Sequence, residues 1–461
     1  MEFSEFILTH DSVDIATLAL QRSRLAKEVS DWDLALCTLE ARRKLKAKLP
    51  SWYAIPSLWY PLPLSAEQCS SEETALYKAS LLTRLEEGTI SETVASRPLP
   101  PAVGPSLLCG RGWPQVSATV PSSGLHIADI TGGLGVDAWA FSKVCEKVLY
   151  NEMKPELARA AEHNFKLLGA DNIVVRNCCV GNGGRFPVKP GMTEGKGITE
   201  DEGMTVREIL GDFEPDVIFM DPARRDDVGR KVFMLEDCSP NVLELLPELY
   251  EACPRIMLKL SPMADITAVC RQLPGVKEVH VVEADGECKE LLLILEKGFK
   301  GQYGLFLYAN ASVAEITWTQ PGNDGGEDLY HCRRESAISD KVLFVPGKGL
   351  MKTGAFRWPE TFGLKQLAAS THMYTGEAKV PELEPFGKFY SIVETVPLSN
   401  KSIKEIGKKY PQADVTARNI PITSDELRKR LGVKPSDGTV HIFGLLSDYE
   451  GRILIVSVIS K

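Results

Sequence analysis

Between residues 124 and 297 the sequence alternates short apolar segments with amphipathic ones, and few folds accommodate this alternation. Five segments of strand length come first, namely "LHIAD", "KVLYNEM", "NIVVRNCCV", "DVIFMD" and "RIMLKLS", and the hairpin pattern "VKEVHVVEADGECKELLLILE" closes the series. Strands that alternate with helices predict a parallel sheet covered by helices on both faces. The closing hairpin predicts an antiparallel edge. The expected fold class is therefore α/β.

The rest of the chain is organised around this α/β region. Residues 1–97 place apolar side chains at helical spacing, interrupted by the Pro-rich stretch "PSWYAIPSLWYPLPLS", and predict a helical N-terminal region. Residues 298–388 mix strand patterns with Gly-rich segments, and residues 389–461 follow the order β-α-β-α-β-β. Because 461 residues exceed one ordinary core, we expect two to four domains. The changes of pattern along the chain divide it into 1–97, 98–297, 298–388 and 389–461, with 98–297 as the central domain.

Composition argues against several classes of protein. The chain is 44% apolar and 25% charged, as soluble globular proteins are. No apolar run approaches the roughly 18–20 residues of a membrane span, and the acidic N-terminus lacks the positive charge of a secretory signal. Eleven cysteines without CxxC pairs and seven scattered histidines predict reduced thiols and no metal site. We expect a cytoplasmic protein.

Charge alone argues against a nucleic-acid partner, because the net charge is −9. Residues 388–461 nevertheless carry 12 Lys and Arg against 8 Asp and Glu, which weakly favours an anionic partner. A binding face or a merely solvated helix surface would account equally for Lys404, Lys408, Lys409, Arg418, Arg428, Lys429 and Arg430. A second basic run at 42–48 precedes several aromatic residues. It suits single-stranded RNA or, as the favoured alternative, packing between a helix and the Pro-rich stretch.

The segment "DITGGLG" lies where the first strand passes into its helix, from Asp129 to Gly135. Ligands of doubly wound sheets bind at the carboxyl ends of strands, and glycines there permit a tight turn and close approach. Gly133, Gly135 and Ala138 also fit the looser dinucleotide pattern, so spacing leaves that ligand open. Asp129 favours a ligand with a positive ammonium group, such as S-adenosylmethionine, over a pyrophosphate. A plain turn without a ligand is the remaining alternative.

Two further acids end neighbouring strands. Glu152 ends the second strand, 17 residues after the last glycine of the turn, and suits ribose hydroxyls. Asp221 ends the fourth strand, and Pro222, Arg224 and Arg225 follow it. The arginines suit a base plane or a phosphate, or alternatively a solvated loop paired with neighbouring acids. Together the acids predict a polar site at one edge of the sheet.

The order of "IADITGGLGVD", "YNEMKP", "DVIFMDPARRD", "LKLSP" and the closing hairpin resembles the class I S-adenosylmethionine-dependent methyltransferases. More narrowly, the whole chain resembles the THUMP-like-domain methyltransferases of bacteria. The resemblance implies a Rossmann-like catalytic domain after the helical region, a ferredoxin-like module at 298–388 and a THUMP-like module at 389–461. THUMP modules are associated with RNA, so the implied activity is methylation of a base nitrogen in tRNA or rRNA.

The resemblance also implies roles for individual residues. Asp129 faces the amino end of the cofactor's methionine moiety, directly or through water, while Glu152 holds the ribose and Asp221 lies at the acceptor atom. The implied cofactor-binding residues are Asp129, Thr131, Gly132, Gly133, Gly135, Asp137, Glu152, Asn177 and Asp221. The implied catalytic residues are Asp221, Pro222, which stiffens the turn, and Arg224.

Departures from the wider class keep alternatives open. Asn177 stands where many relatives carry an acid beside the adenine. Ala223 and Arg224 replace the Pro-aromatic pair of amino-group methylases, and Ser261 stands where uracil C5 methylases need a nucleophilic Cys, which favours direct transfer to nitrogen or oxygen. The alternatives are a methyltransferase of small molecules or proteins, and an inactive RNA-binding protein. Lys259, in an apolar strand, either pairs with Asp221 or tips out at the strand end.

Overall fold

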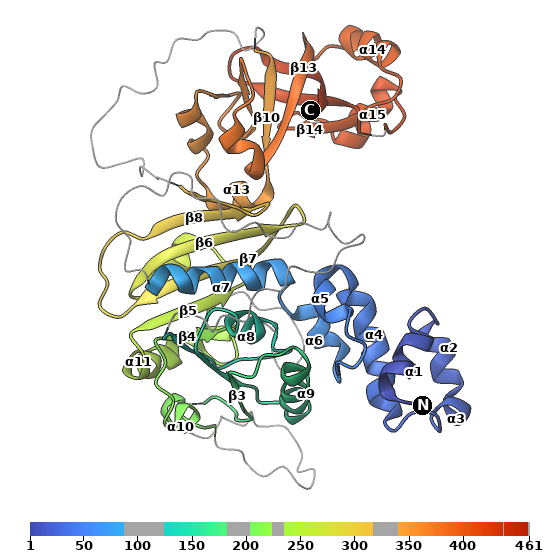
Figure 1. The fold of residues 1–461 in the computed structure, drawn as a ribbon. Coiled ribbons are helices and arrows are strands. Elements are labelled where there is room, and N and C mark those ends of the chain that lie inside the picture. The colour runs from blue at the N-terminus through green and yellow to red at the C-terminus, as the bar shows by residue number, and fades with distance from the viewer. Residues whose placement is uncertain (87–123, 182–202, 224–234, 317–339, 437, 460–461) are drawn as a thin grey trace, which may run out of the picture. The chain divides into compact units, whose positions relative to one another are not determined.

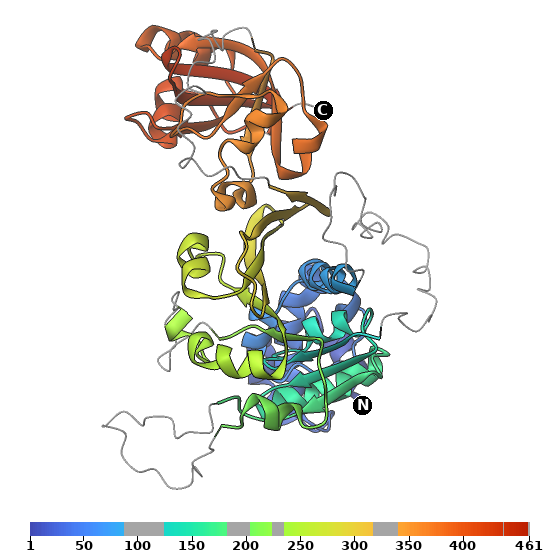
Figure 2. The same cartoon turned by 90° about the vertical axis from the view of Figure 1, so that its left-hand side faces the viewer.

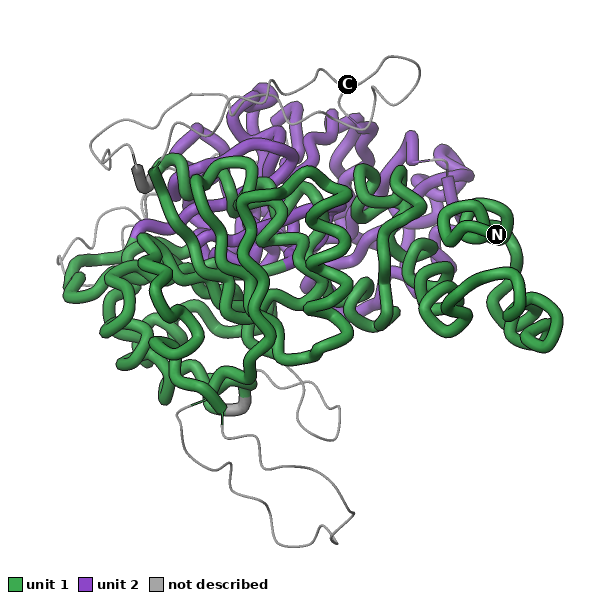
Figure 3. Tube along the Cα trace, turned by 60° about the horizontal axis from the view of Figure 1, so that its bottom comes forward, with its two compact units in different colours: residues 1–279, 290–303 green, residues 280–289, 304–461 purple. Residues whose placement is uncertain are grey.

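The computed structural model describes six ranges of the chain, namely residues 1–86, 124–181, 203–223, 235–316, 340–436 and 438–459. The chain forms two compact units, coloured separately in Figure 3: residues 1–279 with 290–303, and residues 280–289 with 304–461. The α/β class predicted from the alternation is confirmed in the first unit. The boundaries of the four predicted domains stay a prediction.

The N-terminal part of the first unit is helical, as the apolar spacing predicted. Its helices are α1 (Phe3–His10), α2 (Ile15–Leu20), α3 (Arg22–Leu25), α4 (Trp32–Lys48), α5 (Pro50–Tyr53), α6 (Pro63–Gln68) and α7 (Glu72–Glu86) (Figure 1). Asp31 caps α4 by accepting a hydrogen bond from the backbone N–H of Leu34. Among the helices of the described ranges, none is both long and apolar enough to cross a membrane.

The larger sheet begins with the strand order β3-β2-β1-β4-β5-β7-β6, and two further strands given below complete it. These strands are β1 (His126–Asp129), β2 (Lys147–Asn151), β3 (Ile173–Arg176), β4 (Val217–Met220), β5 (Arg255–Leu260), β6 (Val276–Ala284) and β7 (Glu287–Glu296). Strands β1 to β5 pair in parallel, whereas β7 runs antiparallel to β5, as the hairpin pattern predicted. The order reverses between β1 and β4, where doubly wound sheets bind ligands.

Helices cover both faces of this sheet, which confirms the second part of the prediction. They are α8 (Val136–Phe141), α9 (Pro155–Leu167), α10 (Val206–Leu210), α11 (Val242–Ala252) and α12 (Ile266–Gln272), with the 3-10 turn η2 (Leu235–Asp237). Figure 2 shows α7 on one face of the sheet, and α11 and α12 on the other. Strands β1, β2 and β4 are accordingly buried almost throughout.

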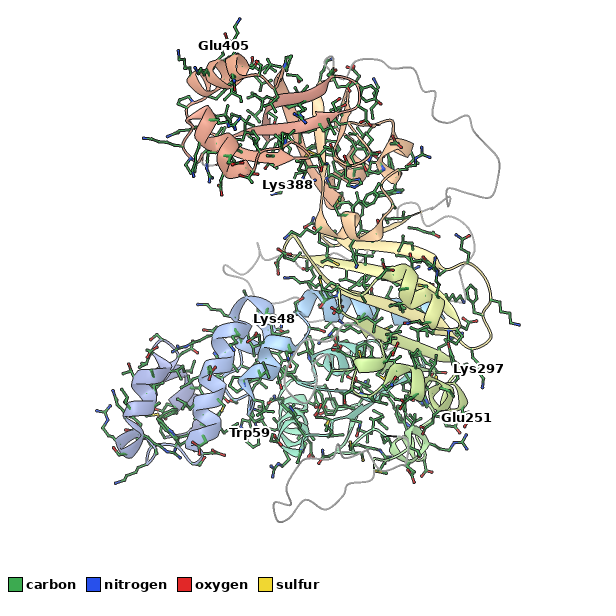
Figure 4. All side chains as sticks on the ribbon, turned by 180° about the vertical axis from the view of Figure 1, so that it is seen from behind. Lys48, Trp59, Glu251, Lys297, Lys388 and Glu405 are labelled. Atoms are coloured by element: carbon green, nitrogen blue, oxygen red, sulfur yellow. The ribbon has the colours of Figure 1, made fainter. Side chains whose placement is uncertain are left out.

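The N-terminal helical region is attached to α9 by specific hydrogen bonds. The buried Asn164 side chain accepts from the backbone N–H of Trp59 at 2.8 Å and donates to its carbonyl at 2.9 Å. The Trp59 ring, labelled in Figure 4, stacks on His163 with ring centroids 3.7 Å apart. This junction fixes the Pro-rich stretch against α9, because its backbone groups find their partners there.

In the basic run at 42–48, Arg42 serves packing, as in the alternative that the sequence favoured, whereas Arg43, Lys44 and Lys46 are exposed. Arg42 is 2% exposed, and its Nε donates to Asp11 Oδ1 at 3.1 Å. Its guanidinium also lies 4.3 Å from the centre of the Tyr53 ring. Trp52 and Tyr60 are fully buried. Stacking surfaces for RNA are therefore not presented by these side chains.

The second unit contains the remaining elements. They are β8 (Gly304–Ala309), β9 (Ser312–Glu315), β10 (Val342–Pro346), α13 (Lys348–Thr353), η5 (Trp358–Phe362), β11 (Lys365–Gln366), β12 (Tyr374–Gly376), η6 (Pro381–Phe386), β13 (Gly387–Pro397), α14 (Asn400–Lys409), β14 (Asp414–Arg418), α15 (Ser424–Leu431), β15 (Val440–Ser447) and β16 (Gly451–Ile459). A seven-stranded sheet runs in the order β11-β12-β10-β13-β16-β15-β14. From β13 onward the elements follow the β-α-β-α-β-β order expected of residues 389–461.

Helices α14 and α15 lie side by side on that sheet (Figure 1) and share one apolar core. Gly407 permits their close approach, because a Cβ at this position would lie 1.8 Å from the carbonyl oxygen of Leu431. Ile403 and Leu427 contribute buried side chains from the two helices. The C-terminal module thus has its own core, and its opposite helix surfaces are left to solvent.

We predict that N164A lowers the free energy of unfolding by about 2–4 kcal/mol, because two buried backbone groups of Trp59 lose their partners. Urea unfolding of the full chain measures the change. K166A on the exposed side of the same helix is the control, since Lys166 only forms an exposed i,i+4 pair with Glu162 and should cost less than about 0.5 kcal/mol. Equal effects of the two substitutions would contradict the prediction.

Candidate functional site

Three acidic side chains meet at the carboxyl edge of the sheet. Asp129 is the last residue of β1, whereas Glu152 and Asp221 directly follow β2 and β4. Both strands are parallel neighbours of β1, and Asp129 pairs in register with Tyr150 and Phe219. Glu152 and Asp221 therefore lie two residues beyond the level of Asp129, at the same edge of the sheet. Their charges act on one another, since Glu152 and Asp221 both raise the pKa of Asp129.

In the glycine turn, the space beside Gly133 is open, whereas aromatic side chains occupy the space beside Gly132 and Gly135. A Cβ at Gly132 would lie 2.1 Å from the Tyr150 ring, and a Cβ at Gly135 would lie 2.7 Å from the Phe165 ring. Gly133 has a φ of +55°, and a Cβ there would meet nothing nearer than 4.0 Å. Gly132 and Gly135 are thus required for packing, while Gly133 exposes backbone on the side of the three acids.

Asp129 is a deeply buried acid, with 1% of its surface exposed. Burial raises the pKa of its carboxyl well above the usual range, and the neighbouring charge of Asp137 raises it further. The hydrogen bond from Thr131 N to Asp129 Oδ1, at 3.1 Å, opposes this effect only in part. A bound cation would favour the ionised form, so the group is suited to a positively charged ligand.

Glu152 is held by backbone donors on either side. Its Oε2 accepts from Gly133 N at 2.8 Å and its Oε1 accepts from Lys154 N at 2.9 Å. A carboxylate offers roughly four acceptor positions, so lone pairs remain for ribose hydroxyls. Asn177, which follows β3, donates its side-chain amide to the Glu152 carbonyl at 2.6 Å. The Asn177 side-chain N–H thus supports the Glu152 backbone. The Asn177 side-chain oxygen is an acceptor that would suit an adenine amine.

Asp221 is paired with the buried Lys259 of β5. Lys259 Nζ lies 2.5 Å from Asp221 Oδ2, and the two side chains are 4% and 27% exposed respectively. Burial lowers the pKa of Lys259, but Asp221, Glu290 and Asp137 together raise it above the usual range. Lys259 is therefore a buried cation. Of the two interpretations of this lysine that the sequence left open, the structure shows pairing with Asp221.

Thr131 joins the glycine turn to the end of β4. Its Oγ1 accepts a hydrogen bond from Asp221 N at 2.7 Å, while its own N–H donates to Asp129. Thr131 consequently links Asp129 at the end of β1 to the backbone of Asp221 after β4. Pro222 follows Asp221 and is buried. Arg224 and Arg225 lie outside the described residues, as do most of the acids proposed as their partners.

Asp137, another residue of the implied cofactor-binding set, is committed to the N-terminal region. Lys78 Nζ of α7 lies 3.2 Å from its Oδ1, and Ser70 donates to its Oδ2 at 2.8 Å. Burial by itself would raise the pKa of Asp137, but Lys78 and Lys259 hold it below the usual range. Its carboxylate supports the turn from the side of α7.

Residues that the sequence analysis passed over complete this arrangement. Lys78 is fully buried and binds Glu290 of β7, with 2.6 Å between Nζ and Oε1. Ser70 accepts hydrogen bonds from both Lys78, at 3.0 Å, and Lys259, at 3.3 Å. A signal existed in "TALYKASLL", because Lys78 stands on the apolar face of a helix, where a lysine needs a buried partner.

Within the part of the chain that the structure describes, no group of three or more His, Cys, Asp or Glu side chains is arranged to hold a metal ion. Ser261, at the place of the nucleophilic Cys in uracil C5 methylases, accepts from Met263 N at 3.2 Å and is buried. The site thus presents carboxylates, a lysine and an open glycine.

Comparison with known proteins locates two domains in the second unit. A family model described as a ferredoxin-like domain matches residues 343–383, and a model described as THUMP domain-like matches residues 387–457. No curated protein matches the sequence. Partial matches to solved structures include ribosomal protein L11 methylase from Lactobacillus delbrueckii subsp. bulgaricus, with 16% identity, 38% of this chain, 72% of that chain and a TM-score of 0.25. Another is the B. subtilis tRNA methyltransferase TrmK, with 15% sequence identity and a TM-score of 0.25. The match covers 39% of this chain and 62% of that chain.

One solved structure matches from end to end. It is a protein of Porphyromonas gingivalis W83 described as a candidate methyltransferase, with 25% identity, a TM-score of 0.68 and coverage of 100% of this chain and 98% of that chain. The two domain matches follow one another along the sequence in the order that the resemblance implied. They come after the strands of a sheet that has the expected topology. The chain thus has the α/β fold of class I methyltransferases, and it carries the ferredoxin-like and THUMP domain-like matches that the sequence resemblance implied.

Proposed function

We propose that this protein is an S-adenosylmethionine-dependent methyltransferase that acts on RNA, namely on a base nitrogen of tRNA or rRNA, by direct transfer. The observation that carries the proposal is the meeting of Asp129, Glu152 and Asp221 beside the open glycine of the turn. Three acids of this kind suit a ligand with a sulfonium and an ammonium group. In this proposal the protein works in the cytoplasm, where its RNA substrate is.

The residues present fit the cofactor. Gly133 leaves room beside its backbone, and Glu152 keeps lone pairs for ribose hydroxyls. Asp129 would attract the ammonium group, directly or through a water, because a positive charge compensates its buried carboxylate. When bound, S-adenosylmethionine supplies a methyl group already activated by its sulfonium sulfur. The chain therefore needs to contribute alignment more than acid–base strength.

Asp221 is the proposed acceptor-side residue. Its backbone is fixed by Thr131 and its Oδ2 by Lys259. Lys259 holds one oxygen, so the other is directed to a substrate N–H, where a hydrogen bond orients the nitrogen lone pair. Alignment of reacting groups lowers barriers by roughly 7–11 kcal/mol in well-oriented pairs. Pro222 and Arg224 stay proposed as the residues that shape the turn and contact the substrate.

The RNA part of the proposal is supported by the THUMP domain-like match and by the charge of the same module. The exposed basic side chains of α14 and α15 comprise Lys404, Lys408, Lys409, Lys429 and Arg430. Arg418 and Arg428 are half-buried. Phosphate contacts by such side chains bring affinity without base specificity. The module proposed at 389–461 would bind the RNA, and the domain proposed at 98–297 would methylate it.

Mass spectrometry of nucleosides from total RNA tests the substrate. We expect one methylated nucleoside to disappear in cells that lack the protein, and to return when the wild-type chain is supplied but not when D221N is supplied. An unchanged nucleoside profile, together with methyl transfer to a protein or small-molecule fraction, would reject RNA as the substrate. Binding of total RNA that weakens steeply with salt supports the same conclusion independently.

We predict that the affinity for S-adenosylmethionine falls as the pH is lowered. The pKa of Asp129 is raised, so this carboxyl takes up a proton earlier than an ordinary aspartate on acidification and loses the charge that attracts the ammonium group. D129N should bind the cofactor at least about tenfold more weakly and lose this pH dependence. Calorimetric titration across the pH range measures both. An affinity of the wild-type chain that is independent of pH contradicts the assignment.

We predict that D221N keeps cofactor affinity within about threefold but lowers the rate of methyl transfer by about 10²–10⁴-fold, because the substrate loses its aligned acceptor. The rate is measured as transfer of radiolabelled methyl groups to total RNA from cells lacking the protein. D212N is the matched control, since Asp212 is exposed after α10 and should leave the rate unchanged. Similar rates for D221N and D212N would remove Asp221 from the mechanism.

A further inference from the structure

We propose that the N-terminal helical region is part of the methyl-transfer site, with Lys78 and Ser70 as positioning residues that set the place of Lys259 and thereby of Asp221. This inference rests on the proposed function and deepens it. The region would then be required for catalysis as well as for docking. All the residues involved belong to the first compact unit.

The first step is the bond between α7 and β7. Lys78 is fully buried on α7, and its Nζ lies 2.6 Å from Glu290 Oε1. Glu290 Oε2 in turn lies 3.7 Å from Lys259 Nζ. The two oxygens of one carboxylate are thus shared between a lysine of the N-terminal region and a lysine of the sheet. Any shift of Lys78 changes how strongly Glu290 attracts Lys259.

The second step is the position of Lys259 between two acids, of which it binds one more closely. Its Nζ is 2.5 Å from Asp221 and 3.7 Å from Glu290, so it is bound to the acceptor-side carboxylate. This preference depends on Lys78, which already compensates Glu290 at short distance. Without Lys78, Glu290 would be a buried anion with Lys259 as its nearest cation. Lys259 would then be drawn toward Glu290 and away from Asp221.

Ser70 connects the two lysines directly. Its Oγ accepts from Lys78 at 3.0 Å and from Lys259 at 3.3 Å, and it donates to Asp137 at 2.8 Å. Ser71, its neighbour, accepts from Thr74 N instead and caps α7. The two adjacent serines therefore have different tasks. Ser71 caps the N-terminus of α7, whereas Ser70 binds the two lysines of the site.

Lys78 also acts on the cofactor side of the site. It forms an ion pair with Asp137, which stands in the first turn of α8, directly after the glycine turn. Asp137 is in turn among the charges that act on Asp129. Among the described residues, Asp221 and Glu152, which directly follow β4 and β2, also act on Asp129. One side chain of α7 therefore influences both the acceptor carboxylate and the cofactor carboxylate.

Counting charges shows what a substitution does. Asp137, Asp221 and Glu290 are three acids that share Lys78 and Lys259, which leaves one negative charge. K78M raises this surplus to two, and K78M/E290Q restores it to one. In a site with low effective dielectric, one unpaired charge changes the electrostatic energy more than it would in water. The double variant should therefore rescue the single one, which a loss of packing alone would not allow.

The experiment compares full-length S70A, S71A, K78M and K78M/E290Q with the wild-type chain. Methyl transfer from radiolabelled S-adenosylmethionine to total RNA of cells lacking the protein gives kcat and KM, and circular dichroism reports folding. We expect S70A to lower kcat about tenfold and K78M about 10²-fold, with the KM for RNA changed less than about twofold. S71A should leave kcat unchanged, and K78M/E290Q should recover at least about tenfold of the loss in K78M.

Equal kcat for S70A and S71A, or a K78M/E290Q variant that is folded but no faster than K78M, would overturn the proposal. Should K78M fail to fold, the serine pair decides. Crystal structures of S70A and K78M give a readout independent of activity, and we expect Lys259 Nζ to move from Asp221 toward Glu290. An unchanged Lys259–Asp221 pair overturns the positioning role. A wild-type chain that neither binds the cofactor nor transfers methyl groups rejects the proposed function, while these crystal structures still test the positioning.

Discussion

Within the described residues, three acids that are buried or partly buried share two buried lysines, and the rest of the site depends on this constraint. Lys78 and Lys259 stand among Asp137, Asp221 and Glu290, and all are largely removed from water. Breaking one such buried pair typically costs about 3–5 kcal/mol, because the remaining charge has no partner. The cluster thus ties α7, α8, β4, β5 and β7 into one arrangement, and it faces the position where a cationic cofactor is proposed to bind.

This constraint explains why the N-terminal helices belong to the same compact unit as the sheet. Asn164 and Trp59 fasten the Pro-rich stretch to α9, and Ser70 and Lys78 join α7 to the carboxyl edge of the sheet. The first contact is neutral and structural, whereas the second carries charge into the site. A region that the sequence alone describes as a helical extension thus contributes charge to the edge of the α/β sheet.

The two units divide the proposed work between chemistry and recognition. The first unit has a sheet whose order reverses beside the acids, and the second has a small sheet with two basic helices. Methyl transfer demands alignment within fractions of an ångström, so its residues sit on rigid strand ends. Binding of an RNA backbone demands only correctly spread positive charge, which exposed helix surfaces provide.

Much of this protein was readable from the chain itself. Strand–helix alternation predicted the parallel sheet, and because the carboxyl ends of parallel strands share one edge, Asp129, Glu152 and Asp221 could be expected to meet. The sequence left the partner of Lys259 open and gave Lys78, Ser70 and Glu290 no part in the site, since Ser70 was considered only as a possible helix cap. These residues stand up to 220 positions apart, from 70 to 290, and only folding brings them together. Local patterns determine which strands and turns form, whereas the pairing of buried charges is decided by tertiary packing, because low dielectric forces each charge to find a partner wherever the fold places it.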